Sequence, residues 1–293
     1  PAKDPFVELC KGSLNTFLNA MTYSDKTVYP VASMNKKDFH NLMHVYMDAV
    51  FYPNIYTRKE ILMQEGWHYE LDEETDELKY NGVVYNEMKG VFSSAEQQLY
   101  RLIEKSLHES TAYGFEAGGD PDYITDLTYE AFLDFHRKYY HPSNSYIYLY
   151  GDMDAVAELE FIDKEYLSNY DYLKVDSELT DEPCFDAPKS VDEYYSIADA
   201  DEETDNTYLT YNVVVGHSDD IKLSLSMAVL EHMLLVAPGA PLKKALIDAE
   251  IGCFLIILLF HRYSAAPITV PYCEFSGMIK RTPKLSCSSS NTR

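Results

Sequence analysis

Cations and cysteines are scarce in this sequence of 293 residues. Lys and Arg number 24 against 48 Asp and Glu, so the formal net charge is −24 at pH 7. Because affinity for nucleic acids comes largely from cationic contacts to phosphate, this balance argues against a nucleic-acid-binding protein. An acidic surface instead favours basic partners.

The five cysteines form no C-x-x-C pair and show no spacing typical of a disulfide framework. A reducing compartment is the simplest interpretation, so we expect a cytoplasmic protein, with an organelle such as the mitochondrial matrix as the alternative. The longest apolar run, residues 253–260, is too short to span a bilayer, and we expect no membrane insertion. The opening segment lacks the layout of a signal peptide. We expect the chain, which begins with Pro1, to be a fragment whose true start is missing.

The common signatures of nucleophilic and nucleotide chemistry are also missing. The sequence contains no G-x-S-x-G, no Gly-rich phosphate loop and no cysteine in a recognisable nucleophile context. Serine, cysteine and nucleotide chemistries therefore have no support.

Hydrophobic periodicity in the first half predicts helices mixed with short strands. Two extended runs, 14–21 and 26–32, flank a Tyr-Ser-Asp turn and predict a hairpin. A helix is predicted over 83–90. Three further helices are predicted to follow the capping residues Asn35, Ser94 and Thr128.

The second half begins with a change in composition. The alternation over 146–150 predicts a half-buried strand. Residues 176–206 are rich in Asp, Glu, Pro and Ser, which predicts a linker that contains one strand over 191–197. Three elements are predicted beyond it: a strand over 207–215, a helix over 223–234 and a short helix from Pro241.

His40, His44 and Asp48 lie at i, i+4 and i+8 of the helix that follows Asn35, a spacing that zinc or iron could use. At about 100° per residue, these side chains lie away from the apolar stripe of the helix. We therefore favour a solvated polar face over a metal site.

The pair Glu231–His232 resembles part of the metallopeptidase signature H-x-x-E-H. The first position of the motif is Ala228 here, and sequence neighbours on a helix point about 100° apart. The pair cannot chelate a metal alone, so we favour a structural role.

Long stretches of the chain resemble a single family. They are residues 3–33 (KDPFVELCKGSLNTFLNAMTYSDKTVYPVAS), 65–70 (EGWHYE), 82–94 (GVVYNEMKGVFSS), 117–154 (AGGDPDYITDLTYEAFLDFHRKYYHPSNSYIYLYGDMD) and 230–252 (LEHMLLVAPGAPLKKALIDAEIG). From residue 3 to about residue 252, the chain is similar to the presequence protease branch of the insulinase (pitrilysin) family of zinc metallopeptidases.

The resemblance implies a set of site residues. In the family, H-x-x-E-H supplies two His ligands and the catalytic Glu, and a Glu on a later helix completes the zinc site. The motif is absent from this sequence, which the resemblance places just after it. The family's N-E-M-K-G segment falls on residues 86–90, so the resemblance assigns Glu87 as a zinc ligand and leaves no catalytic residue in the chain.

The resemblance also implies that substrates add as a strand along a short segment, the β-augmentation mode. That segment consists of Leu18, Asn19, Ala20, Met21 and Thr22. Without the resemblance, an ordinary edge strand would be the preferred interpretation.

The implied fold is α+β, with an incomplete antiparallel sheet backed by helices and the start of a second similar domain. We predict a peptidase-type domain over residues 1–185, lacking its first strands and its zinc helix. A linker and the start of a non-catalytic repeat would cover 186–252. Residues 253–293 hold five Lys or Arg, one acid and three of the five Cys, without a clear period. We predict an aberrant tail there, outside the family sequence.

The implied function is that of a zinc metalloendopeptidase that degrades unstructured peptides, with this chain inactive by itself. The alternative is a non-catalytic family member that acts as a peptide-binding or partner subunit. Zinc is the expected cofactor of the complete protein. Unstructured peptides, with basic ones favoured by the charge, are the expected partners.

Overall fold

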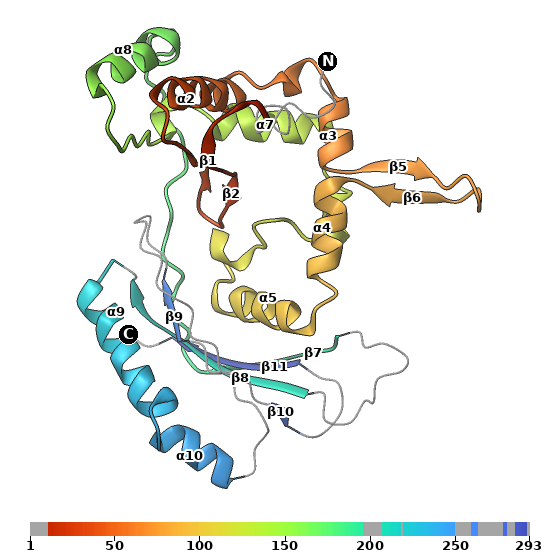
Figure 1. Cartoon of the computed structure of the whole chain (residues 1–293). Coiled ribbons are helices and arrows are strands. Elements are labelled where there is room, and N and C mark those ends of the chain that lie inside the picture. Colours follow the sequence, from red (N-terminus) through yellow and green to blue (C-terminus); the bar gives the residue numbers. More distant parts are fainter. Residues whose placement is uncertain are drawn as a thin grey trace. The chain divides into compact units, whose positions relative to one another are not determined.

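The computed structural model describes residues 11–195, 207–217, 219–249, 259–262, 278–279 and 285–291. Helices alternate with small and mostly antiparallel sheets, so the fold is α+β, as predicted (Figure 1). The chain divides into two compact units. The first unit comprises Pro1–Met88 and Ala117–Glu178, and the second comprises Lys89–Glu116 and Leu179–Arg293. The domain boundaries given above stay a prediction.

The first unit begins with the predicted hairpin. Strand β1 (Asn15–Leu18) pairs with β4 (Val31–Ser33), and β2 (Met21–Thr22) pairs with β3 (Thr27–Val28). Both pairs are antiparallel. The Tyr23 backbone N–H closes the turn on the Lys26 carbonyl at 2.8 Å.

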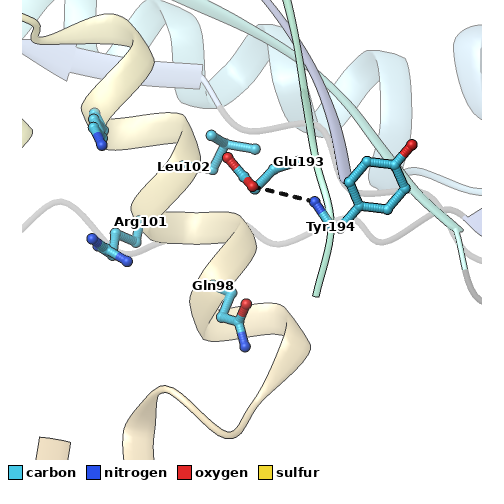
Figure 2. Close-up of a pocket in the computed structure, with 6 residues that line it drawn as sticks. Gln98, Arg101, Leu102, Glu193 and Tyr194 are labelled. Atoms are coloured by element: carbon cyan, nitrogen blue, oxygen red, sulfur yellow. Dashed lines mark hydrogen bonds between the residues drawn. The ribbon is translucent and has the colours of Figure 1, made fainter. Parts of the chain in front are cut away.

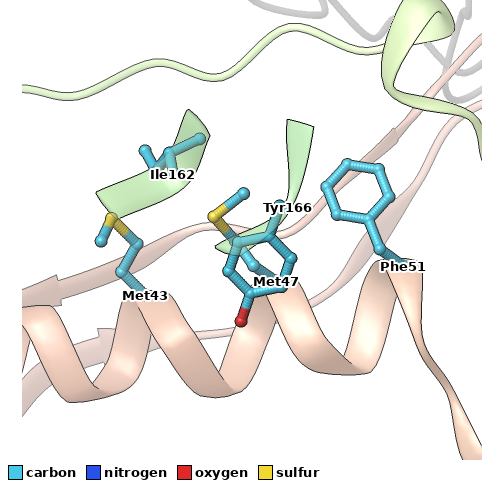
Figure 3. Packing of buried hydrophobic residues seen from close by; sticks show 5 residues of the cluster. All are labelled: Met43, Met47, Phe51, Ile162 and Tyr166. Atoms are coloured by element: carbon cyan, nitrogen blue, oxygen red, sulfur yellow. The ribbon is translucent and has the colours of Figure 1, made fainter. Parts of the chain in front are cut away.

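Helix α2 (Lys36–Phe51) follows, and it begins where the Asn35 side chain accepts a hydrogen bond from the Asp38 backbone N–H. Its apolar side packs on helix α8 (Ala155–Glu165) and the residues after it. Figure 3 shows this core, which consists of Met43, Met47, Phe51, Ile162 and Tyr166. The predicted amphipathic helix is confirmed.

Three elements connect α2 to the segment that carries Glu87. They are η1 (Asn54–Tyr56), α3 (Glu60–Glu65) and an antiparallel hairpin of β5 (His68–Leu71) and β6 (Leu78–Asn81). Helix α4 (Val83–Val91) then begins directly after β6, which confirms the helix predicted over 83–90.

The remaining regular elements of the first unit are helices. It contains α6 (Pro121–Ile124), α7 (Tyr129–Tyr139), η3 (Pro142–Asn144), α8 and η4 (Leu167–Asn169). Thr128 caps α7 by accepting from the Ala131 backbone N–H, as predicted.

The strand predicted over 146–150 is wrong, because this segment forms no strand. Tyr146, Tyr148 and Tyr150 are almost fully exposed. Tyr alternates with Ile and Leu in this segment, as in a half-buried strand, but a strand also needs a neighbouring strand for its backbone hydrogen bonds. No described strand pairs with this segment.

The second unit packs helix α5 (Ala95–Leu107), capped by Ser94 as predicted, on a sheet. Its core consists of Leu99, Ile103, Leu107 and Val214. The sheet contains β7 (Lys189–Glu193), β8 (Thr207–His217), β9 (Leu259–Arg262), β10 (Met278–Ile279) and β11 (Leu285–Asn291), and η2 (Ala112–Gly114) follows α5. The strand within the linker is thus confirmed as β7, although residues 196–206 lie outside the described residues.

Strand β11 pairs antiparallel with β7 and parallel with β8. It falls in the segment 253–293, for which the sequence shows no clear period. Whether that segment belongs to the family sequence stays a prediction.

After β8, the chain continues as α9 (Ile221–Glu231), the π-helix η5 (His232–Val236) and α10 (Pro241–Asp248), as the periodicity and Pro241 predict. This stretch, Ile221–Asp248, is long and apolar enough to cross a membrane by length and composition alone. Its best 18-residue window has a mean hydropathy of 1.5 and is 22% buried. The stretch contains no long uninterrupted apolar run, because polar residues such as Lys222, Glu231 and His232 lie within it.

Candidate functional site

Glu87 lies in α4, whose start is fixed by Asn81 at the end of β6. The Asn81 Oδ1 atom accepts hydrogen bonds from the Gly82 backbone N–H at 2.8 Å and from the Asn86 side chain at 2.6 Å. Its amide nitrogen donates to Glu70 on β5 at 2.6 Å. The helix and the hairpin before it are therefore joined through a single side chain.

Gly82 brings the start of α4 against the end of α3. A Cβ atom at this position would lie 2.2 Å from the Gly66 carbonyl oxygen and 2.8 Å from the Trp67 Cα, distances that no side chain tolerates. The Tyr85 backbone N–H donates to the same Gly66 oxygen at 3.3 Å. Glycine is required here because two backbones approach closely.

Met88 holds the buried side of α4. It is 6% exposed, and a Cβ atom at Gly118 would lie 2.5 Å from its sulfur atom. The adjacent residue Glu87 is exposed, and its carboxylate bonds to no other described residue. The helix thus buries Met88 and leaves the Glu87 carboxylate available.

The described residues do not make up a zinc site. Among them, no three His, Cys, Asp or Glu side chains come close enough to hold a metal ion together. Catalytic zinc takes three protein ligands and a water. Glu87 has the right chemistry for one ligand, and the donor set is otherwise incomplete within the part of the chain that the structure describes.

The segment Leu18–Thr22 runs along the hairpin at the junction of β1 and β2. One of its edges is paired, since Asn19 N–H donates to the Pro30 carbonyl at 3.1 Å and Met21 is in register with Val28. No described strand pairs with the other edge. The structure thus places these residues on an edge strand, and whether they bind a peptide stays a prediction.

Backbone donors alternate between the two edges of this segment. Since Asn19 and Tyr23 donate across the hairpin, Met21 between them faces the same way, and Ala20 faces the open edge. The Ala20 N–H is bonded to the Asn19 side chain at 2.9 Å. A peptide that adds at this edge would therefore meet the donor of Ala20 rather than that of Met21.

Tyr29, opposite Ala20 in the hairpin, connects the segment to Tyr140, the residue directly after α7. Its hydroxyl lies 2.7 Å from that of Tyr140. Burial and this hydrogen bond raise the pKa of Tyr29, so the phenol stays protonated at neutral pH. This contact was not predicted, because no local pattern relates residues 29 and 140.

His136 stacks on Tyr140, with ring centroids 4.5 Å apart. Its Nε2 atom lies 2.9 Å from the Val50 carbonyl oxygen and its Nδ1 atom lies 2.7 Å from the Tyr56 hydroxyl. Because a carbonyl only accepts, Nε2 carries the proton and Nδ1 accepts from Tyr56. Burial lowers the pKa of His136, which favours this neutral form.

The solvated face predicted for His40, His44 and Asp48 is correct only in part. His44 and Asp48 are exposed, but residues of α8 and Tyr166, directly after it, contact this face. His40 Nδ1 lies 2.7 Å from a Glu158 carboxylate oxygen, and Asp48 accepts a hydrogen bond from the Tyr166 hydroxyl at 3.1 Å. The helical wheel could not show this because the covering helix lies more than 100 residues away in sequence.

Glu231 and His232 point in different directions, as their positions on a helix require. Glu231 is buried, whereas His232 is exposed. One Glu231 oxygen, Oε1, has no hydrogen-bond partner among the described residues. The structural role assigned to this pair stays a prediction.

The second unit contains a pocket of about 250 Å³, lined by Gln98, Arg101, Leu102, Lys105, Glu193 and Tyr194. Figure 2 shows side chains of α5 on one side and the end of β7 on the other. The Arg101 guanidinium lies 4.7 Å from the centroid of the Phe92 ring. This pocket contains none of the residues assigned from the sequence.

Comparisons with known proteins find a peptidase family and presequence proteases. The family described as Peptidase M16 inactive domain matches residues 126–261. The chain is 57% identical over 250 residues to Protein HypA of Clostridium perfringens, covering 85% of this chain and 26% of that protein. It is 42% identical over 259 residues to Presequence protease 1, chloroplastic/mitochondrial, of Arabidopsis thaliana, covering 87% of this chain and 24% of that protein.

A solved structure of an M16-like peptidase from Alicyclobacillus acidocaldarius has a similar fold. Its TM-score is 0.53 at 14% identity, over 94% of this chain and 60% of that chain. The chain thus spans about a quarter of the length of the curated relatives named above. Glu87 and the segment Leu18–Thr22 lie outside the residues that match the inactive-domain family.

Proposed function

Since the chain belongs to the insulinase (M16) family of peptidases, in its presequence protease branch, we propose that it forms part of a zinc metalloendopeptidase that degrades unstructured peptides. The observation that carries the proposal is the position of Glu87 in the N-E-M-K-G segment of residues 86–90, where its carboxylate is exposed and bonds to no other described residue. It lies on a helix whose start is held by Asn81 and Gly82.

In this proposal Glu87 is a zinc ligand, and the remaining ligands come from outside the described residues. A carboxylate is a common ligand in catalytic zinc sites, which keep an open position for water. The chain by itself would then be inactive, because one carboxylate leaves most of the coordination sphere to solvent.

The first test replaces Glu87 with Gln in the complete protein. We expect Glu87→Gln to lower zinc content and peptidase activity together, since the amide loses the negative charge and is a poor zinc ligand. The measurements are elemental analysis after dialysis against a weak chelator and hydrolysis of an unstructured peptide. Glu178→Gln, an exposed acid in the same unit, is the matched control. Full zinc content in Glu87→Gln would contradict the proposal.

We further propose that substrates add as a strand along Leu18–Thr22. The variant Ala20→Pro removes the backbone donor on the open edge and leaves the bonds of Asn19 and Met21 within the hairpin intact. We expect the complete protein to bind a non-hydrolysable peptide about tenfold more weakly, since main-chain bonds supply the affinity in this mode. Ala20→Val keeps the N–H and should bind normally. If both variants fold and bind the peptide with equal affinity, this assignment is wrong.

The alternative is a non-catalytic family member that binds peptides or a partner subunit. The observation that favours this alternative is the match of residues 126–261 to a family described as an inactive domain. A peptidase requires H-x-x-E-H to be encoded within about 15 codons upstream of Pro1. Sequencing that region decides between the two functions, because a non-catalytic member would lack at least one of the two His residues or the Glu.

For the compartment, we propose the cytoplasm. The cysteine usage predicts a reducing environment. The chloroplastic and mitochondrial names belong to the relatives, and fractionation of cells that express the complete protein would test the assignment.

A further inference from the structure

The β5–β6 hairpin presents an exposed apolar face that the proposed zinc site does not use. In its register, Tyr69 is opposite Tyr80 and Leu71 is opposite Leu78. Residues two apart share a face of a strand, so these four side chains lie together. Their exposed fractions are 59% for Tyr69, 53% for Leu71, 69% for Leu78 and 44% for Tyr80. Figure 1 shows the hairpin extending away from α3 and α4.

Trp67 holds the aromatic part of this face in place. Its ring centroid lies 5.6 Å from that of Tyr69 and 5.9 Å from that of Tyr80. The indole N–H donates to the Leu127 carbonyl at 3.0 Å, which ties the base of the hairpin to the segment before α7. The rings are thus arranged before any ligand arrives, which reduces the entropy that binding costs.

The turn of the same hairpin is acidic. Five of its six residues, 72–77, are Asp or Glu. Asp72 shapes the turn, because its carboxylate accepts from the backbone N–H groups of Glu74 and Thr75 and pairs with Lys79. The carboxylates of Glu73, Glu74 and Glu77 bond to no other described residue.

We propose that this hairpin binds extended peptides in which apolar and basic side chains alternate. The apolar side chains would cover Tyr69, Leu71, Leu78 and Tyr80. The cationic side chains alternate with them along the peptide and point away from the apolar face, and their long stems reach the free carboxylates of the turn. Exposed apolar surface of this kind marks interaction sites, and the charge of the turn selects a basic partner over an acidic one.

The inference rests on the proposed function only in taking a peptide as the ligand. The probe is a synthetic peptide of alternating Leu and Arg, and the protein is the full chain of 293 residues. Because Trp67 is its single tryptophan, the emission of Trp67 reports directly on the hairpin. We expect a saturable change in emission and a matching heat signal in calorimetry. Neither measurement needs zinc or hydrolysis, so failure here and failure of the peptidase proposal are distinguishable.

Two probe controls separate the contributions. A peptide with Glu in place of Arg should bind at least about tenfold more weakly, because like charges repel at the turn. A peptide with Ser in place of Leu should also bind at least about tenfold more weakly, since it lacks the apolar contacts. Equal binding of all three peptides would overturn the proposal.

Two variants of the protein test the surface itself. Leu71→Ser with Leu78→Ser should weaken binding of the Leu-Arg peptide about tenfold. If that variant does not fold, Glu73→Gln, Glu74→Gln and Glu77→Gln together keep the apolar face, Asp72 and Asp76. This charge variant should bind several-fold more weakly at low salt and lose most of the salt dependence.

The matched controls lie elsewhere on the first unit. Tyr148→Ser with Tyr150→Ser removes two exposed aromatic side chains, and Glu160→Gln with Asp171→Asn removes two exposed acids. Both should bind normally. Wild-type affinity in the two hairpin variants would overturn the proposal. A second result would also overturn the proposal. If the peptide fails to bind, and the chain instead forms a concentration-dependent dimer that Leu71→Ser with Leu78→Ser abolishes, then the face binds a second copy of the chain.

Discussion

Among the described acidic residues of the second unit, Glu104 is the one whose pKa folding changes most. Burial on α5, and secondly the charge of Glu116, raise the pKa of Glu104 to about 7. The folded-state pKa lies above the unfolded value, so the folded unit binds the proton more tightly. Stability is therefore greatest at acidic pH and falls as the pH rises from the unfolded pKa to the folded one.

We predict that Glu104→Gln stabilises the second unit above neutral pH. The amide carries no charge that burial would penalise, so the gain should approach about 3 kcal/mol at pH 8 and vanish near pH 4. Urea unfolding at the two pH values measures it. Glu96→Gln, an exposed acid on the same helix, should show no such gain. A gain that is equal at both pH values would contradict the assigned cause.

At the scale of single elements, the sequence predicted what is decided locally. Asn35, Ser94 and Thr128 each accept a hydrogen bond from a backbone N–H of the first helical turn. Such caps depend on residues three apart in sequence, so the pattern contains them. The start of α2, α5 and α7 could therefore be predicted from the sequence.

Elements that depend on distant partners could not be predicted in this way. The segment 146–150 alternates like a strand but has no strand beside it among the described residues. Conversely, the β5–β6 hairpin was not predicted, since its six-residue turn is acidic rather than rich in glycine. Its apolar side chains alternate correctly, and only the register shows that Tyr69 and Leu71 share a face with Tyr80 and Leu78.

The candidate site shows the same division between local and distant information. Glu87 and Leu18–Thr22 came from a family resemblance, since an exposed Glu on a helix carries no signal of its own. The structure adds what no pattern contains: the side of the strand on which each N–H lies, and the Asn81 side chain that joins α4 to the hairpin. These features decide which variants test the site.

At the scale of the whole molecule, the two units should respond to pH in opposite directions. In the first unit, burial lowers the pKa of His136, and the hydrogen bond from Lys79 lowers the pKa of Asp72. Both folded-state values lie below the unfolded ones, so stability is lost as the pH falls from the unfolded pKa to the folded one. For His136 this loss begins at about pH 6.5, whereas for Asp72 it begins only at about pH 4, so His136 is the group of this pair that acts between about pH 8 and about pH 5. In the second unit, the raised pKa of Glu104 has the opposite effect.

We therefore predict that lowering the pH from about 8 to about 5 destabilises the first unit and stabilises the second. Amide hydrogen exchange measured by mass spectrometry reports the change in stability of each unit separately, once exchange rates are converted to protection factors. Protection should fall in α7 and rise in α5. Glu104→Gln serves as the control, because it should flatten the response of α5 and leave that of α7 unchanged. Protection factors that fall in both helices would show that groups other than His136 and Glu104 dominate the linkage.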